Sequence, residues 1–111
     1  MKQYLLSMYQ PQGQIPPPEV LGPVMEKLGV IRQELMDQGA WVFGQGLHAP
    51  ETATVLRPQG DDVIVTDGPF VEGKEVVSGY TEIEVADLDE ALRMVKTWPG
   101  CPIVEIRPLE S

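Results

Sequence analysis

Apolar residues recur at two spacings along the chain, and these predict both helices and strands. Between residues 19 and 38 the spacing of three and four marks one helical face, made by Leu21, Val24, Met25, Leu28, Ile31 and Leu35. Proline is tolerated in the first turn of a helix, so we expect this helix to begin around Pro23 and to stop at Gly39. A second helix is predicted after Asp87, its N-cap, with Glu90 completing a variant of the capping box.

Short apolar runs bounded by turn residues predict six strands. They cover residues 2–9, 41–47, 52–57, 63–66, 78–86 and 102–108. We expect 52–57 to be the hairpin partner of 41–47, and the proline-rich run 10–18 to be an exposed loop. The order β-α-β-β-β-β-α-β predicts an α+β fold, ferredoxin-like, with a mixed or antiparallel sheet and an inserted hairpin. At 111 residues the chain is predicted to be a single domain over 1–111.

Two helices cannot cover both faces of such a sheet, so we expect both on one face. Period-two alternation then divides the residues of the last two strands between the faces. The helix-covered set is Thr81, Ile83, Val85, Val104 and Ile106, and the opposite set is Tyr80, Glu82, Glu84, Ile103, Glu105 and Arg107. Because the opposite set mixes apolar and charged residues, it suits a half-covered cleft.

Composition narrows the possible partners. Eight basic and seventeen acidic residues give a net charge of −9, which opposes binding to nucleic acid or to a membrane surface. No signal peptide precedes the first strand and no apolar run approaches a membrane span, so we expect a cytoplasmic protein. Cys101, the single cysteine, cannot form an intramolecular disulfide. A domain this small often gains stability by self-association.

The candidate chemistry centres on the run Thr66-Asp67-Gly68-Pro69-Phe70. It closes the apolar run 63–65, so the Asp67 carboxylate stands at a strand end with Gly and Pro fixing the backbone behind it. Asp67 is then either a reactive group or a structural turn residue that bonds its own following backbone.

This turn, the following Glu72-Gly73-Lys74-Glu75 and the final Glu105-Ile106-Arg107-Pro108 resemble the DGPF branch of the YCII-related family. The resemblance implies a dimeric α+β barrel, in which two ferredoxin-like sheets face each other and enclose a pocket. We therefore expect a homodimer with one small-molecule pocket per subunit. Some YCII proteins use a His-Asp pair whose histidine lies in or just before the first helix, a region where this chain has no histidine.

The one histidine, His48, is the candidate partner of Asp67 in general acid-base catalysis, since both close strands and we expect those strands in the same sheet. The alternative is that His48 is an incidental loop residue. Glu75 resembles the glutamate that follows the DGPF turn in the family, and a solvated hairpin residue is its alternative.

Arginine and aromatic residues complete the predicted substrate site. Arg57 and Arg107 are candidate anion clamps, because a guanidinium offers a planar fork to a carboxylate or enolate. A structural ion pair of Arg107 with Glu84 or Glu82 is the alternative. Phe70, Tyr80 and Trp41 are candidates to line an apolar pocket, although core packing explains Trp41 equally well.

The sequence predicts no metal and no cofactor, because it lacks HExxH and CxxC spacings, a phosphate loop and a dinucleotide fingerprint. Two functions stay open. The resemblance implies a cofactor-independent lyase or isomerase that uses Asp67 on a small carbonyl or phenolic compound, as one YCII-like protein is associated with dehydrochlorination of a chlorinated hydroquinone. The alternative is a noncatalytic ligand-binding or regulatory module, since DGPF proteins often accompany extracytoplasmic-function sigma factors.

Overall fold

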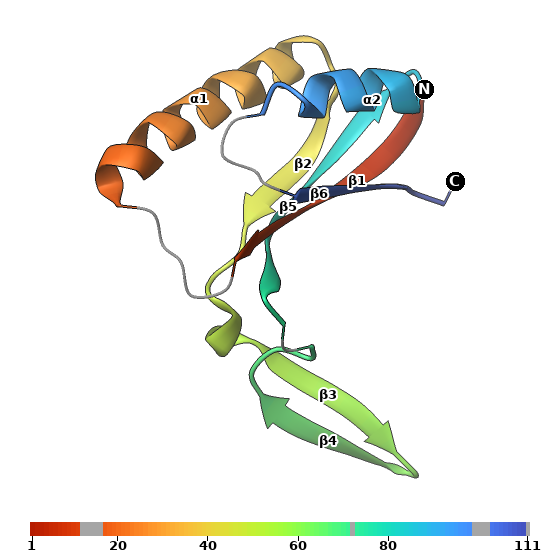
Figure 1. The fold of residues 1–111 in the computed structure, drawn as a ribbon. Coiled ribbons are helices and arrows are strands. Elements are labelled where there is room, and N and C mark those ends of the chain that lie inside the picture. Colours follow the sequence, from red (N-terminus) through yellow and green to blue (C-terminus); the bar gives the residue numbers. More distant parts are fainter. Residues whose placement is uncertain (12–16, 72, 99–102, 111) are drawn as a thin grey trace.

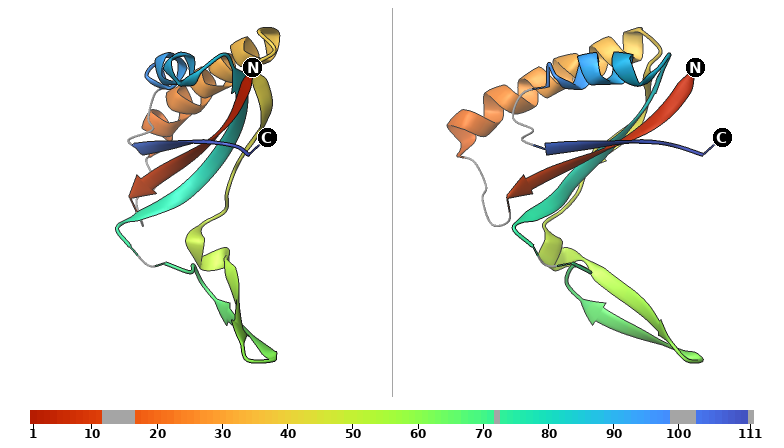
Figure 2. Two further views of the ribbon diagram at one scale, coloured as in Figure 1. Left: turned by 90° about the vertical axis from the view of Figure 1, so that its right-hand side faces the viewer. Right: turned by 45° about the vertical axis from the view of Figure 1, so that its right-hand side comes forward.

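The computed structural model describes residues 1–11, 17–71, 73–98 and 103–110. It consists of a body and a projecting β-hairpin (Figure 1). In chain order the elements are β1 (Lys2–Pro11), α1 (Pro18–Asp37), β2 (Trp41–Gly46), the 3₁₀ helix η1 (Pro50–Thr52), β3 (Thr54–Gln59), β4 (Asp62–Asp67), β5 (Glu75–Val85), α2 (Leu88–Val95) and β6 (Ile103–Pro108). The body is an antiparallel sheet of order β2-β5-β1-β6 with both helices on one face (Figure 2). The predicted ferredoxin-like α+β fold is confirmed. Cys101 and residues 12–16 of the predicted loop lie outside the described residues.

The core lies between the sheet and the two helices, as the alternation predicted. Its buried residues are Tyr4, Leu6, Leu35, Ala40, Ile83, Val85 and Ala91, with Thr81 as the buried polar neighbour. Val104, Ile106 and Trp41 pack against this cluster. Each buried Leu, Ile or Val side chain contributes about 1.5–3 kcal/mol of transfer free energy to the stability of the body.

The helix ends show which local signals the chain uses. The prediction that α1 begins at Pro23 is wrong, because Pro18 already occupies the first helical position and Pro17 is held extended before it. Pro23 is tolerated inside the helix near its exposed start. The predicted stop is confirmed, since Gly39 has φ 73° and the amides of Gly39 and Ala40 bond back to Met36 and Leu35.

The cap of α2 is also confirmed. The Asp87 carboxylate accepts the Glu90 amide at 2.9 Å, and the Glu90 carboxylate accepts the Ala86 amide at 2.8 Å. Two amides at the start of α2 are therefore satisfied by side chains.

The predicted pairing of 52–57 with 41–47 is wrong. Strand β3 pairs with β4, from Thr54 opposite Asp67 to Gln59 opposite Asp62, and β2 pairs instead with β5. Residues 47–53, which include η1, are too long for a tight hairpin, whereas Gly60 with φ 61° forms a two-residue turn between β3 and β4. We call residues 54–67 the arm.

The chain is extended for its length. Its radius of gyration is 16.2 Å, compared with about 13 Å for a compact domain of this length. Its accessible surface is 8242 Å², roughly 2,100 Å² more than the ~6,100 Å² typical of a folded monomer of this mass. Among the described residues, no helix has the length and apolar character needed to cross a membrane.

Candidate functional site

The residues predicted to form one site lie on two separate parts of the molecule. Asp67, Arg57 and Phe70 belong to the arm and the turn that follows it. Tyr80 and Arg107 lie on the sheet of the body, with Glu75 exposed at the start of β5, opposite Pro11 of β1.

Asp67 is the last residue of β4, and its carboxylate is exposed to solvent. Gly68 follows with φ 98°, and its amide donates to the Ala53 carbonyl at 2.8 Å, which ties the two strands together at the base of the arm. Within the described part of the chain, the Asp67 carboxylate has no hydrogen-bond or ion-pair partner. A turn aspartate normally accepts the amide two residues on, but that residue is Pro69, which has no N–H. The Asp67 carboxylate is therefore uncommitted among the described residues.

His48 lies in the exposed segment between β2 and η1. The expectation that His48 and Asp67 follow strands of one sheet is wrong, because β2 belongs to the body sheet and β4 to the arm. In the described residues no hydrogen bond or ion pair joins the two side chains. Their joint action therefore stays a prediction.

Arg57 and Phe70 lie together. The Arg57 guanidinium carbon is 4.8 Å from the centre of the Phe70 ring, within the range of a cation-π contact. The strand register places Arg57 opposite Ile64, whereas Asp67 is opposite Thr54, so Arg57 and Asp67 lie on opposite faces of the arm. Arg57 is thus poorly placed to hold a substrate anion at the Asp67 carboxylate of the same chain.

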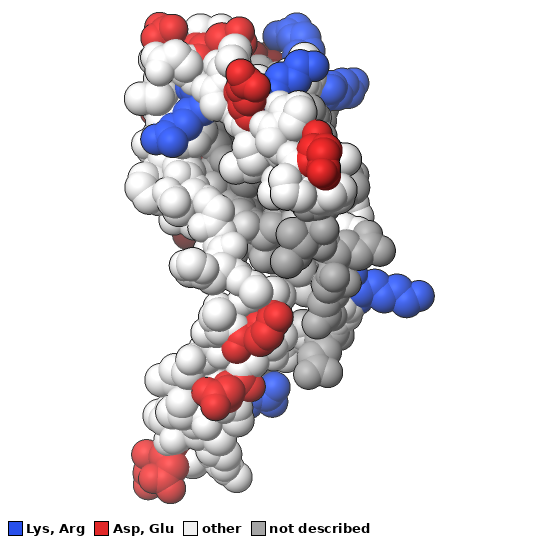
Figure 3. All heavy atoms as spheres, turned by 90° about the vertical axis from the view of Figure 1, so that its left-hand side faces the viewer, with Lys and Arg blue, Asp and Glu red and all other residues white. Residues whose placement is uncertain are grey.

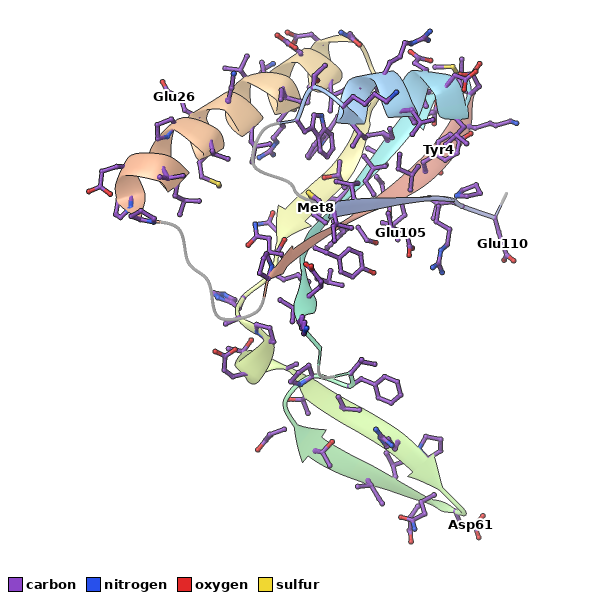
Figure 4. All side chains as sticks on the ribbon, in the orientation of Figure 1. Tyr4, Met8, Glu26, Asp61, Glu105 and Glu110 are labelled. Atoms are coloured by element: carbon purple, nitrogen blue, oxygen red, sulfur yellow. The ribbon has the colours of Figure 1, made fainter. Side chains whose placement is uncertain are left out.

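Tyr80 lies on the face of the body sheet that no helix covers, which we call the open face. Its residues, from the strand registers, are Gln3, Leu5, Ser7, Tyr9, Phe43, Gln45, Val77, Tyr80, Glu82, Glu84, Ile103, Glu105 and Arg107. Figure 4 shows the two sides of the sheet, with Tyr4 toward the helices and Glu105 pointing away from them. The end of the open face nearest the arm is aromatic and aliphatic, and the other end carries the charges.

Phe43 is a site candidate that the sequence did not reveal. Its ring centre is 5.8 Å from that of Tyr80, and the two rings are tilted by 33°. Alternation alone would place Phe43 on the helix side with Trp41, but an irregularity between these residues shifts the register. Trp41 therefore faces the helices, where Arg32 stacks on it at 5.1 Å, and Phe43 faces the open side.

Arg107 forms an ion pair, but not the predicted one. Its guanidinium is 2.8 Å from the Glu105 carboxylate, two residues away on the same face of β6. The Glu84 carboxylate instead accepts a hydrogen bond from the side-chain amide of Gln3 at 3.0 Å. The Arg107 side chain is 72% exposed, so this surface pair stabilises little and leaves the guanidinium accessible.

Other parts of the molecule add no ligand cluster. The described residues contain no group of three or more His, Cys, Asp or Glu arranged to hold a metal ion. A hollow of about 90 Å³ lies between the two helices, lined by Ile31, Leu35, Met94 and Trp98 among others, and none of the predicted site residues lines it.

Comparison with known proteins identifies the family. The model of the YCII-related domain matches residues 1–108. The chain is also 33% identical over 90 residues to the uncharacterized protein R00369 of Rhizobium meliloti (strain 1021), an alignment that covers 78% of this chain and 73% of the relative. The family match spans the body and the arm alike, and this protein belongs to the YCII-related domain family.

Proposed function

We propose that the protein is a small acid-base enzyme, of lyase or isomerase type, that acts on a small carbonyl or phenolic compound in the cleft of a homodimer. The observation that carries the proposal is the uncommitted Asp67 carboxylate. Its backbone is fixed by β4 and by the bond from Gly68 to Ala53. A carboxylate held this way, with no amide or cation bonded to it, is available to accept a proton from a ligand.

Proton transfer is the step that the Asp67 carboxylate performs in this chemistry. The Asp67 carboxylate takes a proton from the carbon next to a carbonyl, and the electron pair of that C–H bond becomes the C=C bond of an enolate. The negative charge collects on the former carbonyl oxygen, where an arginine can stabilise it. In an isomerisation the carboxylic acid returns the proton to a different carbon of the enolate system, and the C=O bond forms again. In an elimination the C=O bond forms again, the enolate electron pair makes a new C=C bond, and a leaving group on the next carbon departs with the electron pair of its own bond and takes the proton from Asp67.

The open face offers the groups that this chemistry lacks on the arm. Tyr80 and Phe43 present a pair of rings on which a planar compound can stack. Arg107 presents an accessible guanidinium to an anionic oxygen. These residues favour a planar, weakly acidic substrate.

Solvent exchange tests the proposal without knowledge of the natural substrate. Pyruvate, acetoacetate and resorcinol are incubated with the protein in D₂O, and loss of the C–H proton signal is followed by NMR. We expect exchange above the buffer rate, and a loss of about 10²- to 10⁴-fold in Asp67→Asn. The matched control is Asp61→Asn, at the tip of the arm (Figure 4), which should retain full exchange.

Two results would change the assignment. Full exchange by Asp67→Asn would remove Asp67 from the mechanism. If no compound exchanges but saturation-transfer NMR shows that resorcinol binds, the protein is the noncatalytic binding module, and a sigma-factor partner becomes the next candidate to test.

A further inference from the structure

Two apolar surfaces among the described residues carry this inference, one on the arm and one on the body. The first is one side of the arm, where Leu56, Pro58, Val63 and Val65 share a face; we call these four residues the arm stripe. Leu56 is 64% exposed, Val65 60% and Val63 57%. The second is the aromatic end of the open face, where Phe43 is 50% and Ile103 is 45% exposed.

The opposite side of the arm is different, because Phe70 stacks on Arg57 there and Val55 is partly buried. That side also carries the exposed Ile64, but it includes Arg57, Gln59 and Asp62, so the arm stripe side is the more apolar of the two. An isolated two-stranded hairpin is marginally stable in water, so the arm needs a surface against which its stripe can pack.

The excess accessible surface of the chain has the size of a dimer interface. A standard interface buries about 800 Å² per partner, and obligate dimers bury roughly 1,000–2,500 Å² per partner. The excess of roughly 2,100 Å² over a compact monomer lies within the obligate range. In a two-fold dimer the two contacts are equivalent. The arm stripe of each copy packs on the open face of the other copy, so both surfaces of both copies are buried at once.

The charge distribution allows this contact despite a net charge of −9 per chain. The arm stripe itself contains no charged residue, and the only charge on its side of β3 and β4 is Asp67 at the base. In Figure 3 acidic side chains gather at the tip of the arm, and uncharged surface separates this cluster from the next acidic group. Packing the stripe against the aromatic end of the open face therefore buries no charge of the stripe.

We infer that the arm stripe of one copy docks on the aromatic end of the open face of a second copy, so that each site combines Asp67 of one chain with Tyr80 and Phe43 of the other. This explains why the predicted site residues fall on two separate parts of one chain. The chemistry of the composite site rests on the proposed function, whereas the docking of the arm does not.

Cross-linking between two different variants tests the docking. In a Cys101→Ser background, chains with Val65→Cys on the arm stripe are mixed with chains with Gln45→Cys, which lies opposite Tyr80 on the open face. The mixture is unfolded, refolded together and treated with a short bis-maleimide. We expect a product of twice the 12.3 kDa chain mass that contains one copy of each variant.

The matched control replaces Val65→Cys by Thr66→Cys, one residue along β4 and on the other side of the arm. It should give at least tenfold less mixed product. Equal yields from the two mixtures, or no mixed product in either, would overturn the inference.

Association measured by analytical ultracentrifugation gives a second readout. Val65→Asp should raise the dimer dissociation constant at least tenfold, because it places a charge in the dry contact. Thr66→Asp should leave the constant unchanged. A wild-type chain that stays monomeric at high concentration, or a dimer that Val65→Asp does not weaken, contradicts the docking.

These measurements separate the two proposals. A protein that cross-links as expected but exchanges no proton keeps the docked arm and loses the acid-base function. A protein that exchanges protons through Asp67 but shows no stripe-specific cross-link keeps the function and loses the composite site.

Discussion

The body and the arm use the same kinds of residue in opposite ways. In β5 every second residue from Gly79 to Val85 is buried, and the helices complete the core above them. In β4 all six residues are exposed, although Val63, Ile64 and Val65 are as apolar as any run in the body. Strand propensity and burial are therefore separate properties: the body is stabilised by a core of its own, whereas every residue of β4 is exposed.

The largest expected effect contrasts the same substitution in the two regions. Leu6→Ala, at a side chain with no exposed surface, should lower the free energy of unfolding by about 2–5 kcal/mol. Leu56→Ala in the arm should change it by less than about 0.5 kcal/mol. Both are measured by urea unfolding in the Val65→Asp background, with tryptophan fluorescence as the reporter, since Trp41 and Trp98 pack against the core. Equal losses would show that the arm and the body unfold as one unit.

A second contrast probes how tightly the side chains pack around β2, the strand from which the chain leaves the body and continues to the arm. A Cβ at Gly44 would lie 2.6 Å from the Trp41 ring and 3.0 Å from the Thr81 hydroxyl, whereas one at Gly46 would meet only the Ser78 carbonyl at 4.0 Å. We expect Gly44→Ala to cost about 1–3 kcal/mol. Gly46→Ala serves as the control and should unfold at nearly the wild-type urea concentration. A neutral Gly44→Ala would mean that the Trp41 ring moves freely.

A third contrast uses two aspartates. Asp87→Ala removes the cap of α2 and should cost about 1 kcal/mol in thermal unfolding. Asp61→Ala at the tip of the arm should leave the melting temperature of the body unchanged, because Asp61 is exposed at the turn. If Asp87→Ala and Asp61→Ala have the same melting temperature, the Asp87 cap does not stabilise α2.

The smallest expected effect is a gain. Gly29 lies inside α1, and a Cβ there would meet no atom within 4 Å, so Gly29→Ala should stabilise the body by about 0.5–1 kcal/mol. Gly60→Ala, at a turn with φ 61°, should strain the arm and leave the body's unfolding as it is. Faster amide hydrogen exchange confined to 54–67 would confirm this difference, and a lower body stability in Gly60→Ala would contradict it.

The sequence predicted those features that depend on local chemistry or on a one-sided core. Alternation assigned Thr81, Ile83 and Val85 to the helix side because one face of β5 is buried, and Gly39 and Asp87 marked helix ends because their backbone roles are local. Long-range pairing could not be predicted in this way. Nothing local indicates that β2 pairs with β5 across about thirty residues of chain, nor that Phe43 turns to the open face.

The sequence predicted which residues are candidates for the site, but it did not predict how they are arranged in space. Asp67 at the end of its strand follows from the turn chemistry, and its exposed position agrees with that prediction. Arg107 pairs with Glu105 rather than with a neighbouring strand because residues two apart on an edge strand share a face. Which residues lie near one another depends on long-range strand pairing, which placed Asp67 on the arm sheet and Tyr80 on the body sheet, and the local pattern does not encode that pairing.

The composition of the arm has a further consequence for aggregation. A run such as Val63-Ile64-Val65 on an exposed edge is the kind of segment that adds strand upon strand into fibres. Here Asp61 and Asp62 precede the run, Asp67 follows it, and Pro58 sits opposite Val63 with no amide to offer a neighbouring strand. Like charges on each added copy and a missing donor oppose stacking of identical arms. The arm can therefore stay exposed in a newly made chain while edge-to-edge growth is disfavoured.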